Sequence, residues 1–139
     1  MIDPLTWKET QRFHTGKEPH HLYLTPDEKS LVIANAQSDS LLFVDPKTAA
    51  VQRTVRNILD PYHLRFSPDM KWLVIVGNRL NHVDLYRWNG KEPTLSKRIP
   101  TRKTPSHVWI DSNSSTAYVS MQESDELVAI DLVSQAIKW

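Results

Sequence analysis

The 139-residue sequence contains no cysteine and only three glycines. Without cysteine the chain cannot form a disulfide framework, thiol-based catalysis, cysteine-ligated zinc or thioether-attached haem. Three glycines do not suggest a glycine-rich phosphate loop, and no nucleophile elbow, His-Glu-x-x-His or paired-carboxylate motif is present. The sequence therefore offers no complete catalytic motif, and a non-enzymatic role is favoured for this chain.

Long apolar runs and an excess of charge are also missing. No apolar run approaches the roughly 20 residues of a membrane span, and the first residues lack the basic and apolar regions of a signal peptide. The net charge of +1 predicts neither a nucleic acid partner nor a membrane partner. With 40% apolar and 24% charged residues, we expect a soluble globular protein. A periplasmic or extracytoplasmic location is favoured for a longer parent chain.

What the sequence does contain is a repeat. The pattern Pro-x-His occurs at residues 19–21, 61–63 and 105–107, after steps of 42 and 44 residues. A Ser/Thr-Pro-Asp turn follows at residues 25–27 and 67–69, and its third copy is Asp-Ser-Asn at residues 111–113. Internal similarity with a period in the low forties and short strands is typical of β-propellers.

Each repeat predicts four short strands. Runs rich in Val, Ile, Leu, Tyr and Phe are bounded by Pro, Asp, Asn or Gly, and no stretch shows a helical period. We therefore predict an all-β fold of four-stranded antiparallel blades, with residues 1–15 as the last strand of a preceding blade and further blades at 16–56, 57–101 and 102–139. The predicted strands are residues 7–14; 20–24, 30–34, 40–45 and 50–55; 63–66, 72–76, 81–86 and 94–99; and 107–111, 116–120, 126–131 and 136–139.

The repeat resembles the YVTN-type β-propeller family, whose usual form reads Pro-His-Gly, Ser-Pro-Asp-Gly, Tyr-Val-Ala-Asn and Val-Ile-Asp. The corresponding pieces in the first full unit are Pro-His-His at 19–21, Thr-Pro-Asp-Glu at 25–28, Leu-Val-Ile-Ala-Asn at 31–35 and Phe-Val-Asp at 43–45. The chain departs from the pattern at Glu28 and Met70, where a turn glycine is usual, and at Arg87, where the strand-ending aspartate is usual. The resemblance implies a propeller, and related propellers include sugar-lactone hydrolases and haem-binding nitrite reductases.

The chain holds about 3.3 units, whereas propellers close with four to eight blades. An incomplete ring exposes the apolar faces of its first and last blades. We therefore expect a partial ring, closed either by the remaining blades of a longer chain or by self-association.

Candidate ligand-binding residues follow from the blade geometry. The first strand of each propeller blade lines the central channel, which places His21, His63 and His107 at equivalent positions near its mouth. Loops between second and third strands rim the same face. Imidazoles there can bind a divalent metal, serve a haem or hold an anion; alternatively, Pro-x-His is a structural device that caps a loop carbonyl. The candidates are His21, His63, His107, Asn35, Asn78, Arg79 and Gln122.

Two further expectations concern aromatic side chains. Adjacent strand residues alternate, so the rings of His20 and His21 should point to opposite sides. The tryptophans occupy different repeat positions and are expected in core and inter-blade packing. They are Trp7, Trp72, Trp88, Trp109 and Trp139.

Three functions remain open at this point. The first, which we favour, is a non-enzymatic scaffold that binds a protein or a small molecule through the channel-mouth face. The second is a lactonase-like hydrolase, and the third is a haem-binding propeller of the nitrite-reductase type. No motif predicts a cofactor, so haem or a divalent metal is an alternative that depends on the three histidines alone.

Overall fold

The computed structural model describes residues 1–139 and contains three four-stranded antiparallel sheets with no α-helix. Each sheet is one blade, and its strands follow one another in chain order. The first blade holds β1 (Pro19–Leu24), β2 (Leu31–Asn35), β3 (Ser40–Val44) and β4 (Val51–Arg56), with a short 3₁₀ turn η1 (Ala36–Ser38). The second holds β5 (Pro61–Phe66), β6 (Trp72–Gly77), β7 (His82–Trp88) and β8 (Pro93–Pro100). The third holds β9 (Pro105–Ile110), β10 (Thr116–Met121), β11 (Glu126–Asp131) and β12 (Ala136–Ile137).

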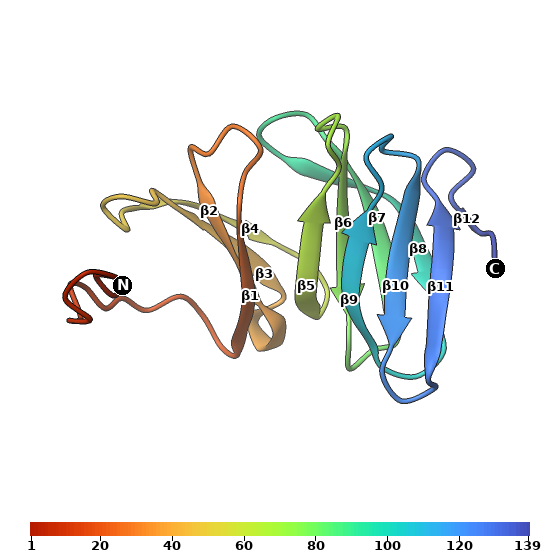
Figure 1. Ribbon diagram of the computed structural model, residues 1–139, viewed down its shortest axis with the longest axis horizontal. Helices are drawn as coiled ribbons and strands as arrows, with labels where there is room; N and C mark the ends of the chain where they lie inside the picture. Colours follow the sequence, from red (N-terminus) through yellow and green to blue (C-terminus); the bar gives the residue numbers. More distant parts are fainter.

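The blades stack side by side, and the first strands β1, β5 and β9 are neighbours in the stack (Figure 1). The predicted all-β fold of four-stranded propeller blades is confirmed, and the three blades form an open, partial ring. No helix in the structure has the length and apolar character that crossing a membrane requires.

The Ser/Thr-Pro-Asp hairpin turns are built alike in the first two blades. Thr25 Oγ1 donates to Asp27 at 2.7 Å, and Ser67 Oγ donates to Asp69 at the same distance. Glu28 and Met70 then adopt left-handed φ values of 57° and 59°, at the position where the family pattern has glycine. The turn therefore keeps a conformation that favours glycine even though glycine is absent.

A second turn follows the third strand of each blade. Asp45 Oδ1 accepts hydrogen bonds from the backbone nitrogens of Lys47 and Thr48, both at 2.8 Å. In the second blade Arg87 stands at the aligned position. There Asn89 takes this role, and its Oδ1 accepts hydrogen bonds from the backbone nitrogens of Lys91 at 2.9 Å and Glu92 at 2.7 Å. The longer turn thus moves the capping side chain by two residues and keeps the same interaction.

Residues 7–14, predicted as an outermost strand, do not form one. Only the isolated bridge between Ile2 and Glu9 is present. This pair lies 42 residues before Val44 and Val51, which pair as β3 with β4. The bridge therefore keeps the register of the repeat, but the residues around it do not continue the pairing into a strand.

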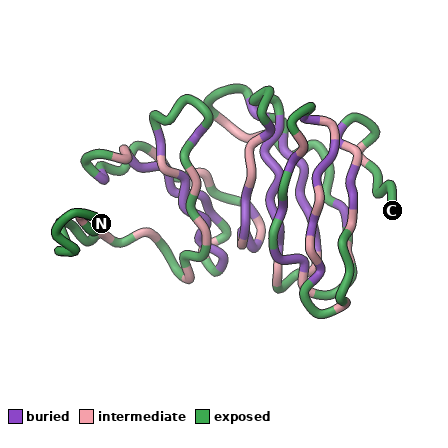
Figure 2. Tube along the Cα trace, viewed as in Figure 1, coloured by how far each residue is buried: buried purple, intermediate pink, exposed green.

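Two hydrophobic cores fill the spaces between blades. Leu73 and Ile75 of β6 pack toward the first blade, whereas Val74 and Val76 pack toward the third. This alternation explains why β6 is apolar along its whole length, since both of its faces are buried. Figure 2 shows the buried residues along the middle strands and the exposed ones at the turns and both chain ends.

The outer faces of the stack are less covered. Phe13 packs on the small cluster of Ile33, Leu42 and Val44 on the first blade. On the last blade Leu127 and Trp139 remain 52% and 63% exposed. Apolar surface on the last blade agrees with a blade that has no neighbour on one side, whereas the N-terminal segment covers the cluster on the first blade.

Candidate functional site

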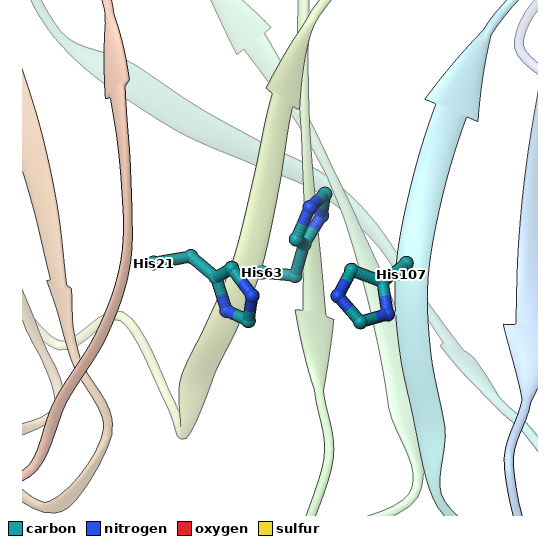
Figure 3. A group of neighbouring side chains, drawn as sticks. All are labelled: His21, His63 and His107. Carbon is teal, nitrogen blue, oxygen red and sulfur yellow. The ribbon is translucent and has the colours of Figure 1, made fainter.

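Three histidines from three different blades meet where the first strands β1, β5 and β9 lie side by side. His21, His63 and His107 are the third residues of β1, β5 and β9. Their ring centroids lie 4.7 Å apart for each neighbouring pair and 5.1 Å apart for His21 and His107. One nitrogen of each ring lies within 4.8 Å of the other two. Figure 3 shows the three rings turned toward a common space, and we call these residues the histidine row.

The start of each inner strand is irregular. The register shifts between Pro19 and Leu22 in β1 and between Pro61 and His63 in β5. Proline has no N–H to donate to the ladder, and bulges of this kind redirect side chains. The shift in β1 also corrects one expectation, because the rings of His20 and His21 lie 6.4 Å apart, and both contact the ring of Tyr62.

His21 and His107 are each held through Nδ1. Nδ1 of His21 lies 3.0 Å from the carbonyl oxygen of Tyr62, which can only accept, so this nitrogen carries the proton. Nδ1 of His107 lies 3.0 Å from the hydroxyl of Ser106. Neither Nε2 makes a hydrogen bond to the protein. The carbonyl cap on His21 agrees with the structural role considered for Pro-x-His, yet it leaves a free nitrogen lone pair on that ring.

His63 is the buried member of the row, with 3% of its surface exposed. The backbone nitrogen of Val108 donates to its Nδ1 at 3.3 Å, so Nε2 carries the proton and donates to the hydroxyl of Tyr23 at 3.0 Å. Burial, followed by the nearby histidines His21 and His107, lowers the pKa of His63 to about 3. Burial is also the main cause of the lowered pKa of His21. These two rings are therefore biased toward the neutral form, which is the form that binds metals.

A second row of side chains lies two residues further along the same strands. Tyr23, Arg65 and Trp109 form this Tyr–Arg–Trp row, since residues i and i+2 of a strand share a face. The guanidinium carbon of Arg65 lies 4.0 Å from the ring centroid of Trp109 and 5.1 Å from that of Tyr23. The three residues line a groove of about 960 Å³ that continues to the hairpin turns.

Sequence reasoning missed the Tyr–Arg–Trp row, although a two-residue step from each histidine would have found it. Trp109 was expected in packing but is 59% exposed, and Trp7 and Trp139 are exposed as well. Only Trp72 and Trp88 lie in the cores. The difference arises because Trp109 lies outside the inter-blade cores, where only the guanidinium of Arg65 stacks on its ring.

The loop candidates occupy other positions. Asn35 is buried, with Nδ2 3.5 Å from the carbonyl of Thr15. Asn78 Nδ2 donates to the carbonyl of Pro105 at 2.9 Å, across two blades. Gln122 is exposed in the loop after β10. None of these side chains contacts a histidine of the row by a hydrogen bond or lines the groove.

Arg79 belongs to a separate network. Its Nε and backbone nitrogen donate to the buried carboxylate of Asp60 at 2.8 and 2.7 Å, and its guanidinium reaches the carbonyl of Ala36 at 3.2 Å. The carboxylate raises the pKa of Arg79. These contacts tie the loop of the first blade to that of the second.

A model of YNCE-like β-propellers matches the sequence over residues 1–139. Hydrazine synthase from Kuenenia stuttgartiensis is similar in structure, with a TM-score of 0.73 and 24% identity over 94% of this chain and 38% of that one. A putative 6-phosphogluconolactonase from Bacteroides fragilis has a TM-score of 0.74 and 16% identity over 92% of this chain and 39% of that one. The WD40 repeats of RRP9 give a TM-score of 0.72 and 13% identity, with 92% and 39% covered.

The chain spans about two fifths of the length of these solved structures. At such identities the likeness establishes the propeller fold. No curated protein sequence matches the chain. The predicted resemblance to a propeller repeat family is confirmed by the family match over the whole sequence.

Proposed function

The chain belongs to the YNCE-like β-propeller family, and on that premise we propose that it is a non-enzymatic binding propeller whose inner wall holds a small anionic ligand. The inner wall consists of the histidine row and the Tyr–Arg–Trp row on β1, β5 and β9. The two rows contain imidazoles, a phenol, an indole and a guanidinium, but no carboxylate to complete an acid–base pair.

The guanidinium of Arg65 is the observation that carries this proposal. Its face lies over Trp109 and Tyr23, while its N–H groups donate no hydrogen bond to the protein. An arginine held by stacking presents a planar set of donors, and that geometry suits a carboxylate or a phosphate. The groove beside it supplies room for the rest of the ligand.

The proposal can be tested with 6-phosphogluconate, which carries both a carboxylate and a phosphate. We expect saturable binding to the 139-residue chain, reported by a change in tryptophan fluorescence that is reduced in Trp109→Phe. Arg65→Met should weaken binding about tenfold or more, since a charged hydrogen bond contributes about 1.5 to 3 kcal/mol. Arg102→Met is the matched control, because Arg102 is an exposed arginine paired with Glu126 away from the row.

Unchanged affinity in Arg65→Met would contradict the proposal. The two alternatives have their own signals in the same preparation. Hydrolysis of 6-phosphogluconolactone would favour the lactonase-like enzyme. A shift of the haem Soret band that is lost in His21→Ala and His107→Ala would favour the haem-binding propeller.

A further inference from the structure

We infer that the histidine row is a binding site for one divalent transition-metal ion of the group that imidazole favours, such as Zn²⁺, Ni²⁺ or Cu²⁺. This inference rests on the proposed function, because it assigns a ligand class to part of the same inner wall. It concerns the end of the wall formed by His21, His63 and His107, whereas the anion is assigned to Arg65.

The three histidine rings are close enough to share one ion after a small movement. Three ring nitrogens from β1, β5 and β9 lie within 4.8 Å of one another. Zinc–nitrogen bonds of 2.0–2.1 Å in a tetrahedral site place ligand nitrogens about 3.4 Å apart. The row must therefore contract by about 1.4 Å or less at its widest pair. Figure 3 shows the rings of His21 and His107 turned toward each other with the ring of His63 between them, so rotation of the two outer side chains would bring their nitrogens closer.

The hydrogen bonds of the outer two rings are the second argument. A metal-bound histidine usually donates its other N–H to a carbonyl or carboxylate, which fixes the tautomer. His21 does this toward the carbonyl of Tyr62, and its Nε2 has no protein partner. Nδ1 of His107 lies 3.0 Å from the hydroxyl of Ser106, which can accept a hydrogen bond from this nitrogen or donate one to it. Both rings are thus fixed at Nδ1 and free at Nε2 without any metal present.

The three histidines differ in solvent exposure and therefore in how freely their rings can move. His63 is buried and makes hydrogen bonds at both nitrogens, so it is the fixed member of the row. Nε2 of His63 carries the proton, so the ring ligates through Nδ1; this keeps the Nε2–H hydrogen bond to the hydroxyl of Tyr23 and gives up the 3.3 Å hydrogen bond from the backbone nitrogen of Val108. His107 is exposed and His21 is partly buried, so these two can close on the ion.

The chemistry of the donors selects the metal class. The set contains only imidazoles, which suit zinc, copper and nickel, whereas calcium and magnesium need oxygen ligands. Three protein ligands leave a fourth position open to water or another small ligand. Arg65 and Trp109 lie on the next channel-facing positions of β5 and β9, so an anion bound there approaches that position.

The experiment uses the full 139-residue chain, freed of metal with a chelator and titrated with Zn²⁺ by calorimetry and with Co²⁺ by visible absorption. We expect one ion per chain and Co²⁺ bands typical of nitrogen coordination. The double variant His21→Ala/His107→Ala should lose about 100-fold or more in Zn²⁺ affinity. Neither residue is deeply buried, so its metal-free melting temperature should stay near that of the parent. His14→Ala, at an exposed histidine of the N-terminal segment, should bind like the parent.

Equal Zn²⁺ affinity in the double variant and the parent would overturn the inference, as would the absence of saturable one-to-one binding. Failure of the proposed function gives a different pattern. In that case Zn²⁺ still binds, but 6-phosphogluconate either does not bind or binds Arg65→Met as tightly as the parent. If 6-phosphogluconate binds through Arg65 and Zn²⁺ does not bind, the inference fails and the proposed function stands. If neither binds, both fail.

Discussion

The carboxylate of Asp60 accepts two hydrogen bonds from Arg79, one from the backbone nitrogen at 2.7 Å and one from Nε at 2.8 Å. A third comes from the backbone nitrogen of Leu80 at 3.0 Å. Asp60 is fully buried, whereas the side chain of Arg79 is 46% exposed. The aspartate therefore organises the loop, and the arginine can turn to water if the aspartate is removed.

Asp60→Ala should lower the free energy of unfolding by about 2 to 4 kcal/mol, because two partly buried backbone N–H groups lose their acceptor. Chemical denaturation monitored by circular dichroism measures the change. Glu9→Ala is the control, since Glu9 forms an exposed pair with Arg12 that should contribute about 0 to 1 kcal/mol. Equal effects of the two substitutions would contradict this account of Asp60.

Gly77 is required by its neighbour His82. A Cβ added to Gly77 would lie 2.1 Å from Cε1 of His82, a ring that is itself buried. Gly77→Ala should therefore cost about 2 kcal/mol through overpacking.

A double-mutant cycle checks this mechanism. In a His82→Ala background the same glycine substitution should cost much less, because the clashing ring is gone. An undiminished cost in that background would show that the clash is not the cause.

Met70 holds a left-handed φ of 59° in the second hairpin turn. Met70→Gly should raise the free energy of unfolding by about 0.5 kcal/mol, since relief of the left-handed strain exceeds the added freedom of the unfolded chain. The melting temperature reports the gain. Lys71→Gly, one residue later, should be destabilising instead, and a loss in both variants would refute the strain argument.

Asp111 is predicted to make stability depend on pH. Its carboxylate accepts hydrogen bonds from Oγ and the backbone nitrogen of Ser115, both at 2.7 Å, and these hydrogen bonds lower its pKa below the ordinary value. The unfolded chain then takes up the proton at higher pH than the folded chain does. The contribution of Asp111 is complete above about pH 4 and is lost as the pH falls through the lowered folded pKa.

The variant Asp111→Asn reveals this dependence. It should be less stable than the parent at neutral pH, and the difference should shrink as the pH falls below about 4. Urea midpoints measured between about pH 2 and 7 give the comparison. A difference that stays constant over this range would mean that the hydrogen bonds do not act through the charge.

The sequence predicted the blades well because each strand is encoded locally. The repeat placed the ends of all twelve strands within two residues of where the structure has them. Alternating burial and turn residues are properties of adjacent positions. The strand predicted at residues 7–14 does not form, because strand formation requires a paired partner as well as a suitable local sequence.

The site was only partly accessible to the same reasoning. The repeat identified His21, His63 and His107 as equivalent, but steps of 42 and 44 residues along the chain do not tell how far apart the rings lie in space. Their separation depends on the angle between blades, which is set by the packing of the inter-blade cores. The role of Arg65 likewise depends on Trp109, which belongs to another blade.

His21 and His107 belong to blades that are not neighbours, yet their rings lie 5.1 Å apart. An ion bound by both rings would fix the angle between successive blades at the inner edge of the stack. The tilt per blade determines how many blades complete a circle, so fixing it at the inner edge would fix the ring size. The histidine row would then determine the number of blades in the completed ring, and ion binding would restrict which partners can complete that ring.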